Sequence, residues 1–368
     1  MKNGLFITRE DLYEKDALAN GVIKKILNQI FVLNIEGQLS CKPLVLPKPT
    51  YNPVFLFISY LSFDVYKRMH IDPHLYDFIY IRRISPVNYS FLKLLKMIRK
   101  GNEKCKIIYE IPTYPYDYEH KTLYSKFNLF IDKIFREKLK KYVDRVITVS
   151  NDNEIFGIPA IKIKNGICCA EIQIRMPKTF SEDLNLIAVA QFALWHGYDR
   201  LIKGIYDFKK KEKNKNVYIH FVGDGPELNT YKNLVKKYSL FQYVTFYGAL
   251  AGEKLTEVLN KADIAICSLG AHRVGISQGS FLKSREYLAR GMPMVSSTKI
   301  DILPEGFKYC LYVPEDESSI NISHIIEYYL NLLKHENLYE ITRKIRIFAE
   351  DHCDISKTMQ PVIEYISR

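Results

Sequence analysis

The chain has 368 residues, of which 47% are hydrophobic, and a formal net charge of +12. This length exceeds that of one ordinary hydrophobic core, so we expect two domains of roughly 150 to 200 residues each. No run of about 18 apolar residues occurs, which excludes a membrane-spanning helix, and seven unpatterned cysteines favour reduced thiols in a cytoplasm over disulfides or a zinc site.

Short apolar segments alternate with helical patterns in the first half of the chain. The predicted strands there are 4–8, 54–59, 78–81, 106–110 and 145–149, and the predicted helices are 22–33, 91–100 and 128–142. Apolar strands linked by helices are typical of a doubly wound, parallel α/β sheet. The apolar run at the beginning of the sequence is too short for a secretory signal peptide.

A second α/β set follows a change of pattern near residues 158–185. A strand ends at the Asn165-Gly166 turn, and residues 175–183 have the composition of an interdomain linker. The predicted strands of the second set are 186–190, 217–222, 244–247, 264–268 and 294–297, and its predicted helices include 228–238 and 254–261. Residues 319–368 predict helices that are interrupted near Cys353 and Asp354.

The excess of positive charge lies in the first half. Residues 1–180 hold 29 Lys and Arg against 18 Asp and Glu, whereas the remainder holds 24 against 23. A basic amphipathic helix gains about 1 kcal/mol per Lys or Arg near an anionic bilayer. A solvated helix face is the alternative, and no motif supports nucleic-acid binding. Two basic clusters fall in predicted helices: Lys93, Lys96, Arg99, Lys100, Lys104 and Lys106, then Lys133, Arg136, Lys138, Lys140, Lys141 and Arg145.

Residues 278–295 carry the most informative chemical pattern. Gly279 and Ser280 open a predicted helix, and Lys283 and Glu286 share one of its faces. A helix N-terminus beside a Lys suits an anion such as a diphosphate. A carboxylate one turn later can accept hydrogen bonds from a ribose diol. This pattern predicts a nucleotide-sugar site, with a merely solvated amphipathic helix as the alternative.

The loop after predicted strand 217–222 contains Gly223-Asp224-Gly225. Glycines at the carboxyl end of a strand let the backbone approach a ligand closely, and this end of an open α/β sheet is where ligands bind. A purely structural turn is the alternative interpretation.

Cations follow predicted strand 186–190. His196, Arg200 and Lys203 come soon after its end, where positive charge can balance a leaving diphosphate. Trp195, the only tryptophan of the chain, is in the same loop, and we expect its side chain to pack rather than to stack on a base.

Residues 186–300 resemble the donor-binding half of the GT-B glycosyltransferases, in particular the retaining group called family 4. The first half is more loosely similar to the polysaccharide-assembly branch of that family, through Asn20-Gly21, the segments 110–117 and 147–150, and the turn 165–167. The markers of the second half are Phe-Val-Gly-Asp-Gly-Pro-Glu (221–227), Val-Thr-Phe-Tyr-Gly (244–248), Lys-Ala-Asp-Ile (261–264) and Leu-Lys-Ser-Arg-Glu-Tyr-Leu-Ala-Arg-Gly-Met-Pro (282–293).

The resemblance implies an architecture and an activity. Two Rossmann-like, doubly wound domains, 1–170 on the acceptor side and 171–350 on the donor side, would face a cleft, with a helix at 351–368 packing back on the first domain. The enzyme would move a hexose from a nucleoside-diphosphate sugar to a lipid-linked or oligosaccharide acceptor, with retention of anomeric configuration and without metal or cofactor. UDP is the commoner base in this family.

The same resemblance implies a biological setting. The branch assembles surface polysaccharides such as capsule, exopolysaccharide or O-antigen. The chain would therefore be a cytoplasmic protein whose basic first domain attaches to the anionic inner face of the plasma membrane, and nucleic acid would not be a partner.

Individual positions carry over from the family to this chain. Of two glutamates eight positions apart, Glu286 matches the second, and Gln278 stands where the first would orient the hexose. The Arg and Lys that contact the diphosphate in the family correspond to Gln191 and His196 in this chain. Arg200 and Lys283 would therefore supply the positive charge at the diphosphate instead. The candidate catalytic residues are Glu110 (as a side-chain base), Lys283 and Arg200, and the candidate donor-binding residues are Gly21, His196, Gly223, Asp224, Gly225, Tyr247, Gln278, Gly279, Ser280, Lys283 and Glu286.

Two alternatives stay open. A catalytically idle GT-B scaffold is motivated by Gln278 and by the lack of the His that the family often places in its first domain. A non-hydrolysing sugar-nucleotide epimerase shares the fold, but its acid/base carboxylates and His do not stand out. Hydrolysis of the donor sugar would separate an enzyme from a scaffold.

Overall fold

The computed structural model describes residues 1–13, 21–35, 39–47, 66, 69, 71–117, 122–176, 183–212 and 215–368. The predicted strand 54–59 lies outside these ranges. The chain forms two compact units: unit 1 is Met1–Lys164 with Thr358–Arg368, and unit 2 is Asn165–Lys357. The first division falls six residues before the boundary expected at 170, and the second falls seven residues after the one expected at 350.

Unit 1 is built on a seven-stranded sheet in the order β2-β1-β3-β4-β5-β7-β6. All neighbours run parallel except β6, which pairs antiparallel with β7. Every residue of β3 is buried, because helices cover both faces of the sheet centre. The strands are β1 (Lys2–Thr8), β2 (Leu39–Val45), β3 (Phe78–Arg82), β4 (Lys106–Ile111), β5 (Arg145–Thr148), β6 (Glu154–Ile155) and β7 (Ile158–Lys162).

The helices of unit 1 begin at residues suited to capping. The Asn88 side chain accepts from the Phe91 N–H at the start of α3, and Thr122 and Ser125 form a capping box on α4. The helical elements are α1 (Gly21–Ile35), η2 (Pro73–Leu75), α3 (Tyr89–Gly101), α4 (Leu123–Phe135), η4 (Arg136–Lys141) and α12 (Gln360–Ser367).

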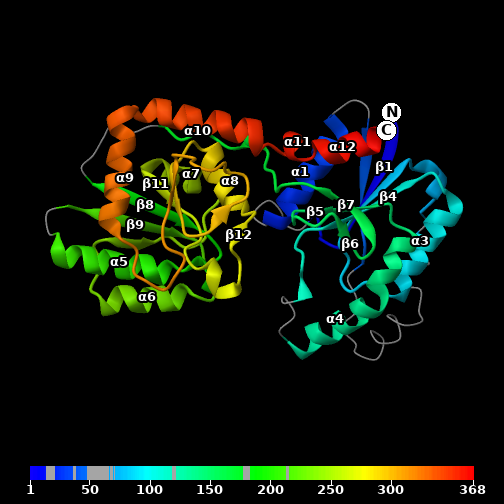
Figure 1. Cartoon of the computed structure of the whole chain (residues 1–368), viewed down its shortest axis with the longest axis horizontal. Helices are drawn as coiled ribbons and strands as arrows, with labels where there is room; N and C mark the ends of the chain where they lie inside the picture. The colour runs from blue at the N-terminus through cyan, green and yellow to red at the C-terminus, as the bar shows by residue number, and fades with distance from the viewer. Residues whose placement is uncertain are drawn as a thin grey trace. The chain divides into compact units, whose positions relative to one another are not determined.

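Helix α12 returns to unit 1 from the far end of the sequence (Figure 1). The Lys2 ammonium donates to the carbonyls of Ile366 and Ser367 at 2.7 and 2.9 Å, and the Lys106 ammonium donates to the carbonyl of Tyr365 at 2.8 Å. Lysines at the last carbonyls satisfy acceptors that the helix itself leaves unpaired and complement its dipole.

Unit 2 contains a six-stranded parallel sheet in the order β10-β9-β8-β11-β13-β15, with a separate pair, β12 and β14. The chain leaves β8 toward β9 and β10 on one side and then returns past β8 to β11 on the other side. The carboxyl ends of β8 and β11 therefore flank a topological switch point, where open α/β sheets bind ligands. The strands are β8 (Leu184–Val189), β9 (Val217–Val222), β10 (Val244–Phe246), β11 (Ile264–Ile266), β12 (Gln278–Gly279), β13 (Met294–Ser296), β14 (Lys299–Ile300) and β15 (Cys310–Tyr312).

Amphipathic helices cover this second sheet (Figure 1). Their buried residues form two apolar clusters, one on each side of β8, β9 and β11. The helical elements are η5 (Cys169–Glu171), η6 (Leu194–His196), α5 (Tyr198–Lys211), α6 (Leu228–Lys237), α7 (Gly252–Lys261), η7 (Ala271–Val274), α8 (Leu282–Ala289), α9 (Ile322–His335), α10 (Leu338–His352) and α11 (Ile355–Thr358).

Two Rossmann-like, doubly wound α/β domains confirm the predicted fold class. Some local predictions were wrong. The expected helix 128–142 begins earlier, as α4, and changes to the 3₁₀ helix η4 at Arg136. The strands β2, β6, β12, β14 and β15 were not predicted. Within the described ranges, no helix is long and apolar enough to cross a bilayer, and no group of three or more His, Cys, Asp or Glu could hold a metal ion.

At Gly204 we expect a substitution by alanine to destabilise the protein, although alanine usually stabilises a helix relative to glycine. Gly204 lies inside α5, where alanine ordinarily gains up to about 1 kcal/mol over glycine. A Cβ at this position would stand 2.2 Å from the carbonyl oxygen of Ile320, and such overpacking costs typically 1–3 kcal/mol. We expect Gly204→Ala to lower the free energy of unfolding by about 1–2 kcal/mol in urea titrations.

The matched control is Gly21→Ala at the start of α1, where a Cβ would meet no atom of the described residues within 4 Å. This variant should be as stable as the wild type or slightly more stable. An unchanged unfolding midpoint for Gly204→Ala would contradict the close packing of α5 on residue 320.

Candidate functional site

Two loops meet at the switch point of unit 2. The Leu269 N–H donates to the His196 carbonyl at 2.9 Å, and the Gly270 N–H donates to the Trp195 carbonyl at 3.2 Å. Gly197 has a φ of 62°, and a Cβ there would lie 2.6 Å from the Gly270 nitrogen. Only glycine allows this backbone conformation together with this close approach. The loops after β8 and β11 are thus fixed to each other at the carboxyl edge of the sheet.

Lys283 brings a positive charge to this edge from the first turn of α8. Its ammonium lies 3.2 Å from the Tyr198 hydroxyl and 5.5 Å from the centre of that ring. Burial lowers the pKa of Lys283 to about 8. Among the described residues, no carboxylate lies within ion-pair distance of it. A desolvated cation without a neutralising carboxylate favours an anionic ligand.

His196 is a neutral neighbour of this cation. Its Nδ1 accepts a hydrogen bond from the Ala193 N–H at 3.0 Å, so Nε2 carries the proton. Burial, together with the charge of Lys283, lowers the pKa of His196 to about 2. The imidazole stacks on Tyr198 with ring centres 5.4 Å apart. Lys283 and His196 therefore reach the same region as one charged and one neutral donor.

Trp195 presents much of its side chain to solvent, so the expected packing of this ring is only partial. Its side chain is 42% exposed, and its ring centre lies 5.7 Å from that of His196. The backbone is held by donors from the Ser268 hydroxyl and the Gly270 N–H to the Trp195 carbonyl. A rigid backbone thus carries an exposed aromatic ring beside the candidate anion site.

Arg200 is buried with its guanidinium committed to the backbone of unit 2. It donates to the carbonyls of Leu269, Ser318 and Pro314 and to the carboxylate of Asp316, the last at 3.2 Å. This is a correction of its predicted role as a diphosphate cation: it ties the loop after β15 to the loop after β11. Lys203, which follows it on α5, is exposed.

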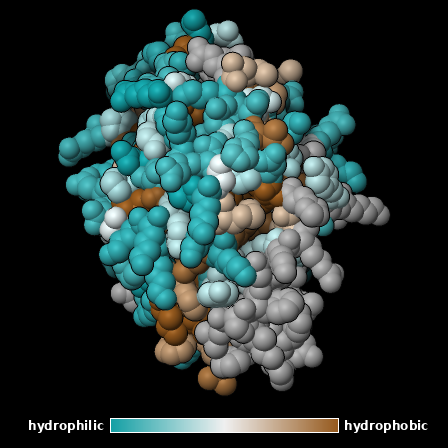
Figure 2. Space-filling model, turned by 90° about the vertical axis from the view of Figure 1, so that its right-hand side faces the viewer, coloured by the Kyte–Doolittle hydropathy of each residue, from teal (hydrophilic) through white to brown (hydrophobic). Residues whose placement is uncertain are grey.

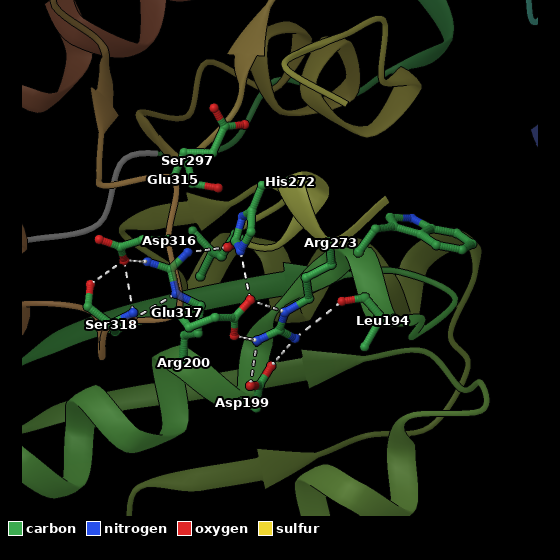
Figure 3. A network of polar contacts seen from close by, with 12 residues as sticks. Leu194, Asp199, Arg200, His272, Arg273, Ser297, Glu315, Asp316, Glu317 and Ser318 are labelled. Atoms are coloured by element: carbon green, nitrogen blue, oxygen red, sulfur yellow. Dashed lines mark hydrogen bonds and ion pairs between the residues drawn. The ribbon is translucent and has the colours of Figure 1, made fainter. Parts of the chain in front are cut away.

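Arg273 is a second anchor, which the sequence analysis did not single out (Figure 3). Its guanidinium makes two 2.8 Å bonds to the carboxylate of Asp199 and also binds Glu317, which accepts from His272 at 2.7 Å. Bonds from Arg273 and His272 lower the pKa of Glu317 to about 2. The network joins η7, the start of α5 and the loop after β15. No local motif distinguishes Arg273, because its partners are about 44 and 74 positions away.

The glycine motif after β9 serves the packing of these loops. At Gly223, with a φ of 133°, a Cβ would lie 1.9 Å from the Ala190 carbonyl oxygen. At Gly225, with a φ of 142°, it would lie 2.4 Å from the carbonyl oxygen of Phe192. Asp224 is exposed, and its side chain caps the N–H of Gly225 at 2.7 Å. The structural interpretation of both glycines is therefore supported, in place of a close approach to a ligand.

The segment before α8 differs from its prediction. Gln278 and Gly279 form the short strand β12 beside β14, and α8 begins at Leu282 without a side-chain cap. Gln278 is exposed. The Ser280 hydroxyl accepts from the buried Arg285 at 3.2 Å. Gly279 and Ser280 therefore support the start of the helix and are not part of it.

Glu286 and Tyr247 are the other donor-side candidates of unit 2. Glu286 lies one turn after Lys283 on α8 and is partly buried. The Tyr247 hydroxyl lies 3.0 Å from Nδ1 of His220, whose Nε2 lies 3.1 Å from Oδ1 of Asn185. Tyr247 thus belongs to a polar chain that runs across β9 and β8.

Glu110 and Gly21 belong to unit 1. Oε1 of Glu110 accepts from Lys25 at 2.9 Å, Arg82 at 3.2 Å and Gln29 at 3.3 Å. Burial raises the pKa of Glu110, but the charges of Lys25 and Arg82 outweigh it and lower the pKa to about 2. Such a carboxylate is a weak base, so its predicted role as general base is corrected to an internal ion pair. Gly21 opens α1 beside residues outside the described ranges.

Comparisons with known proteins bear on the fold and the family of the chain. Residues 171–337 match the family model described as glycosyl transferases group 1. No curated protein matches the chain in sequence.

Among solved structures, a glycosyltransferase from Rickettsia africae is 14% identical over 99% of this chain and 97% of its own, with a TM-score of 0.66. HepE of Anabaena, in complex with UDP and glucose, is 14% identical over the full length of both chains, with a TM-score of 0.60. The lipopolysaccharide outer core galactosyltransferase WaaB is 16% identical over 100% of this chain and 99% of its own, also with a TM-score of 0.60. The fold is GT-B, and the match of residues 171–337 to the group 1 model supports a glycosyltransferase.

The low pKa of Lys283 predicts how nucleotide binding depends on pH. Lys283 is charged below pH 8 and neutral above it, so a diphosphate held by its charge binds more weakly as the pH rises. If only the charged form binds, the Kd for a nucleoside diphosphate rises roughly tenfold from pH 7 to pH 9. Calorimetric titrations across this range test the expectation.

The control is Lys283→Arg, whose guanidinium stays charged throughout and whose Kd should therefore change little with pH. A wild-type Kd that is constant between pH 7 and pH 9 would separate Lys283 from the anion.

Proposed function

We propose that this protein is a retaining, metal-independent hexosyltransferase that moves a sugar from a UDP-sugar to a lipid-linked or oligosaccharide acceptor in surface polysaccharide assembly. The observation that carries the proposal is the partly buried Lys283, which has no described carboxylate partner and lies beside neutral His196 at the switch point of unit 2.

Departure of the nucleoside diphosphate sets the main electrostatic demand. The bond between the anomeric carbon and the diphosphate oxygen breaks, and negative charge develops on the leaving phosphate. Lys283 balances this charge, and Nε2 of His196 donates a hydrogen bond to it. In a dry site each such donor is worth about 10²–10³ in rate. Because His196 is neutral, it adds a donor without repelling Lys283.

Glu286 and the leaving phosphate complete the assignment. Glu286 follows Lys283 by one helical turn, a separation that suits a ribose diol beside a bound diphosphate. Glu110 is an ionised, ion-paired carboxylate with a pKa of about 2 and is poorly suited to act as a base. We therefore assign deprotonation of the acceptor hydroxyl to the leaving phosphate, on the same face of the sugar, which gives retention.

The structural neighbours suggest which ligands to test first. HepE has been solved with UDP and glucose and with UDP-glucose, which makes UDP the first nucleotide to try here. WaaB acts in the lipopolysaccharide outer core, which supports a surface saccharide as the acceptor class. Attachment to the inner face of the plasma membrane belongs to the same proposal.

An idle scaffold is the second candidate. Gln278, in the place of a family carboxylate, lies exposed in β12, with an amide where a hexose-orienting acid would be. An idle scaffold would release no UDP from any UDP-sugar, whereas the proposed enzyme hydrolyses its donor slowly when no acceptor is present.

Lys283→Ala should reduce sugar transfer by about 10²–10³-fold while the fold survives, because one donor to the leaving group is lost. Lys236→Ala is the matched control, since Lys236 is an exposed lysine of α6 that has no assigned role at the site. UDP release from UDP-sugars and the thermal unfolding midpoint would be measured for both variants. Wild-type turnover by Lys283→Ala would refute the assignment.

Trp195 offers a direct reading of ligand binding, because it is the only tryptophan in the chain. Its exposed ring lies beside His196, so a nucleotide sugar at the site should remove it from water. We expect the fluorescence to shift to shorter wavelength and to saturate at the calorimetric Kd. If calorimetry detects binding of a nucleotide but the Trp195 emission does not change, the ligand binds elsewhere. Trp195→Phe should lose the signal and keep the affinity within a few-fold.

A further inference from the structure

Helix α4 of unit 1 has apolar side chains on an exposed side as well as on the side that packs in the core. Ile131 and Phe135 are buried in the core of unit 1. Leu123, Phe130 and Ile134 are 88%, 61% and 42% exposed. At 3.6 residues per turn, these three positions fall within a narrow band on one side of the helix. We call Leu123, Phe130 and Ile134 the apolar stripe.

Lysines border the apolar stripe along one edge. Lys126 and Lys133 are exposed and lie on the same side of the helix, next to the stripe. Lys133 bonds to Asp117 at 3.1 Å but remains 51% exposed. The η4 turn that follows adds a group of exposed lysines: Lys138, Lys140 and Lys141.

Acidic residues do little to offset this charge. Asp132 is buried on the opposite side of α4, where it accepts from the Val87 N–H at 2.8 Å and from the Tyr116 hydroxyl at 2.7 Å. Glu137 is the only exposed carboxylate within 122–141, all of which are described, against the five exposed lysines named above. The helix therefore presents apolar and cationic side chains together.

The basic clusters noted in the sequence contribute less than their number suggests. Arg99 donates to Asp144 at 2.8 Å, Lys106 holds the end of α12, and Arg136 pairs with Asp117 at 2.8 Å. These cations stabilise unit 1 internally. The face shown in Figure 2 is mainly hydrophilic, with apolar side chains both near its centre and toward its lower end.

We propose that the apolar stripe of α4 docks into the interface of an anionic lipid bilayer, with Lys126 and Lys133 at the level of the headgroups. An exposed apolar band bordered by lysines is the pattern of helices that lie in the plane of a membrane surface. The docking surface itself does not depend on the proposed function. Its biological role, which is to bring unit 1 to a lipid-linked acceptor, rests on that proposed function.

Charge and size favour a bilayer over a second copy of this chain. Stable protein interfaces bury about 800 Å² on each partner, which is more than three side chains on one helix supply. A symmetric pair would also bring the lysine edges of two copies together, whereas anionic headgroups neutralise them.

Co-sedimentation of the full chain with vesicles tests the docking. We expect binding to phosphatidylcholine vesicles that contain phosphatidylglycerol, and at least tenfold weaker binding to phosphatidylcholine alone. Phe130→Ser with Ile134→Ser should reduce binding to the anionic vesicles at least tenfold. The double variant Lys126→Glu with Lys133→Glu should reduce the difference in binding affinity between the anionic vesicles and the phosphatidylcholine vesicles.

Matched controls lie in unit 2. Phe241→Ser removes an apolar side chain that is 67% exposed, and Lys236→Glu with Lys237→Glu reverses two exposed lysines of α6. Both should leave vesicle binding within twofold of the wild type. All variants should keep the wild-type Kd for UDP, which separates failure of docking from failure of the donor site.

Two outcomes would overturn the proposal. One is vesicle binding that the α4 variants leave unchanged. The other is a dimer in light scattering that the apolar variants convert to a monomer, which would make the stripe a protein interface. As an independent probe, Phe130→Trp in a Trp195→Phe background should shift its emission to shorter wavelength with anionic vesicles, and an unshifted emission would also contradict docking.

Discussion

The partly buried ammonium group of Lys283 sets the electrostatic character of the carboxyl edge of unit 2. A cation removed from water without a nearby carboxylate raises the free energy of the unliganded protein, and an anion relieves it. The neighbouring groups are consistent with this condition: His196 is held neutral and donates from Nε2, and Tyr198 contacts the ammonium through its hydroxyl and the imidazole through its ring. The carboxylates nearby, Asp199 and Glu317, are occupied by Arg273.

Unit 1 handles buried charge in the opposite way. Glu110 lies in a similar position, near the carboxyl end of a parallel strand, but Lys25 and Arg82 neutralise it within the unit. Replacing one partner of such a cluster leaves the other buried and uncompensated, so its residues are constrained by the fold itself. The same residue types therefore stabilise unit 1 and leave unit 2 with a cation that has no carboxylate partner among the described residues.

Structural elements could be predicted from the sequence where a local pattern was sufficient. Prediction failed where residues distant in the sequence determine the role of a side chain or the place of a strand. Strand β9 was predicted with its observed bounds because a run of apolar residues ends at two glycines. Strand β2 was missed because it contains Pro43 and polar residues, which are tolerated since it lies at the sheet edge. Lys283 could be singled out from its spacing to Glu286. The roles of Arg200 and Arg273 could not, because their partners lie up to 118 positions away and only folding brings them together.

The return of α12 to unit 1 has a consequence for synthesis of the chain. Residues 358–368 leave the ribosome after the whole of unit 2, yet their buried side chains and the last carbonyls of α12 belong to the first unit. Unit 2 is continuous in sequence and can complete its core first. Until α12 is synthesised, the first unit lacks the hydrogen bonds that Lys2 and Lys106 donate to the carbonyls of α12. Loss of these eleven residues would therefore expose apolar surface in the part of the protein that is translated earliest.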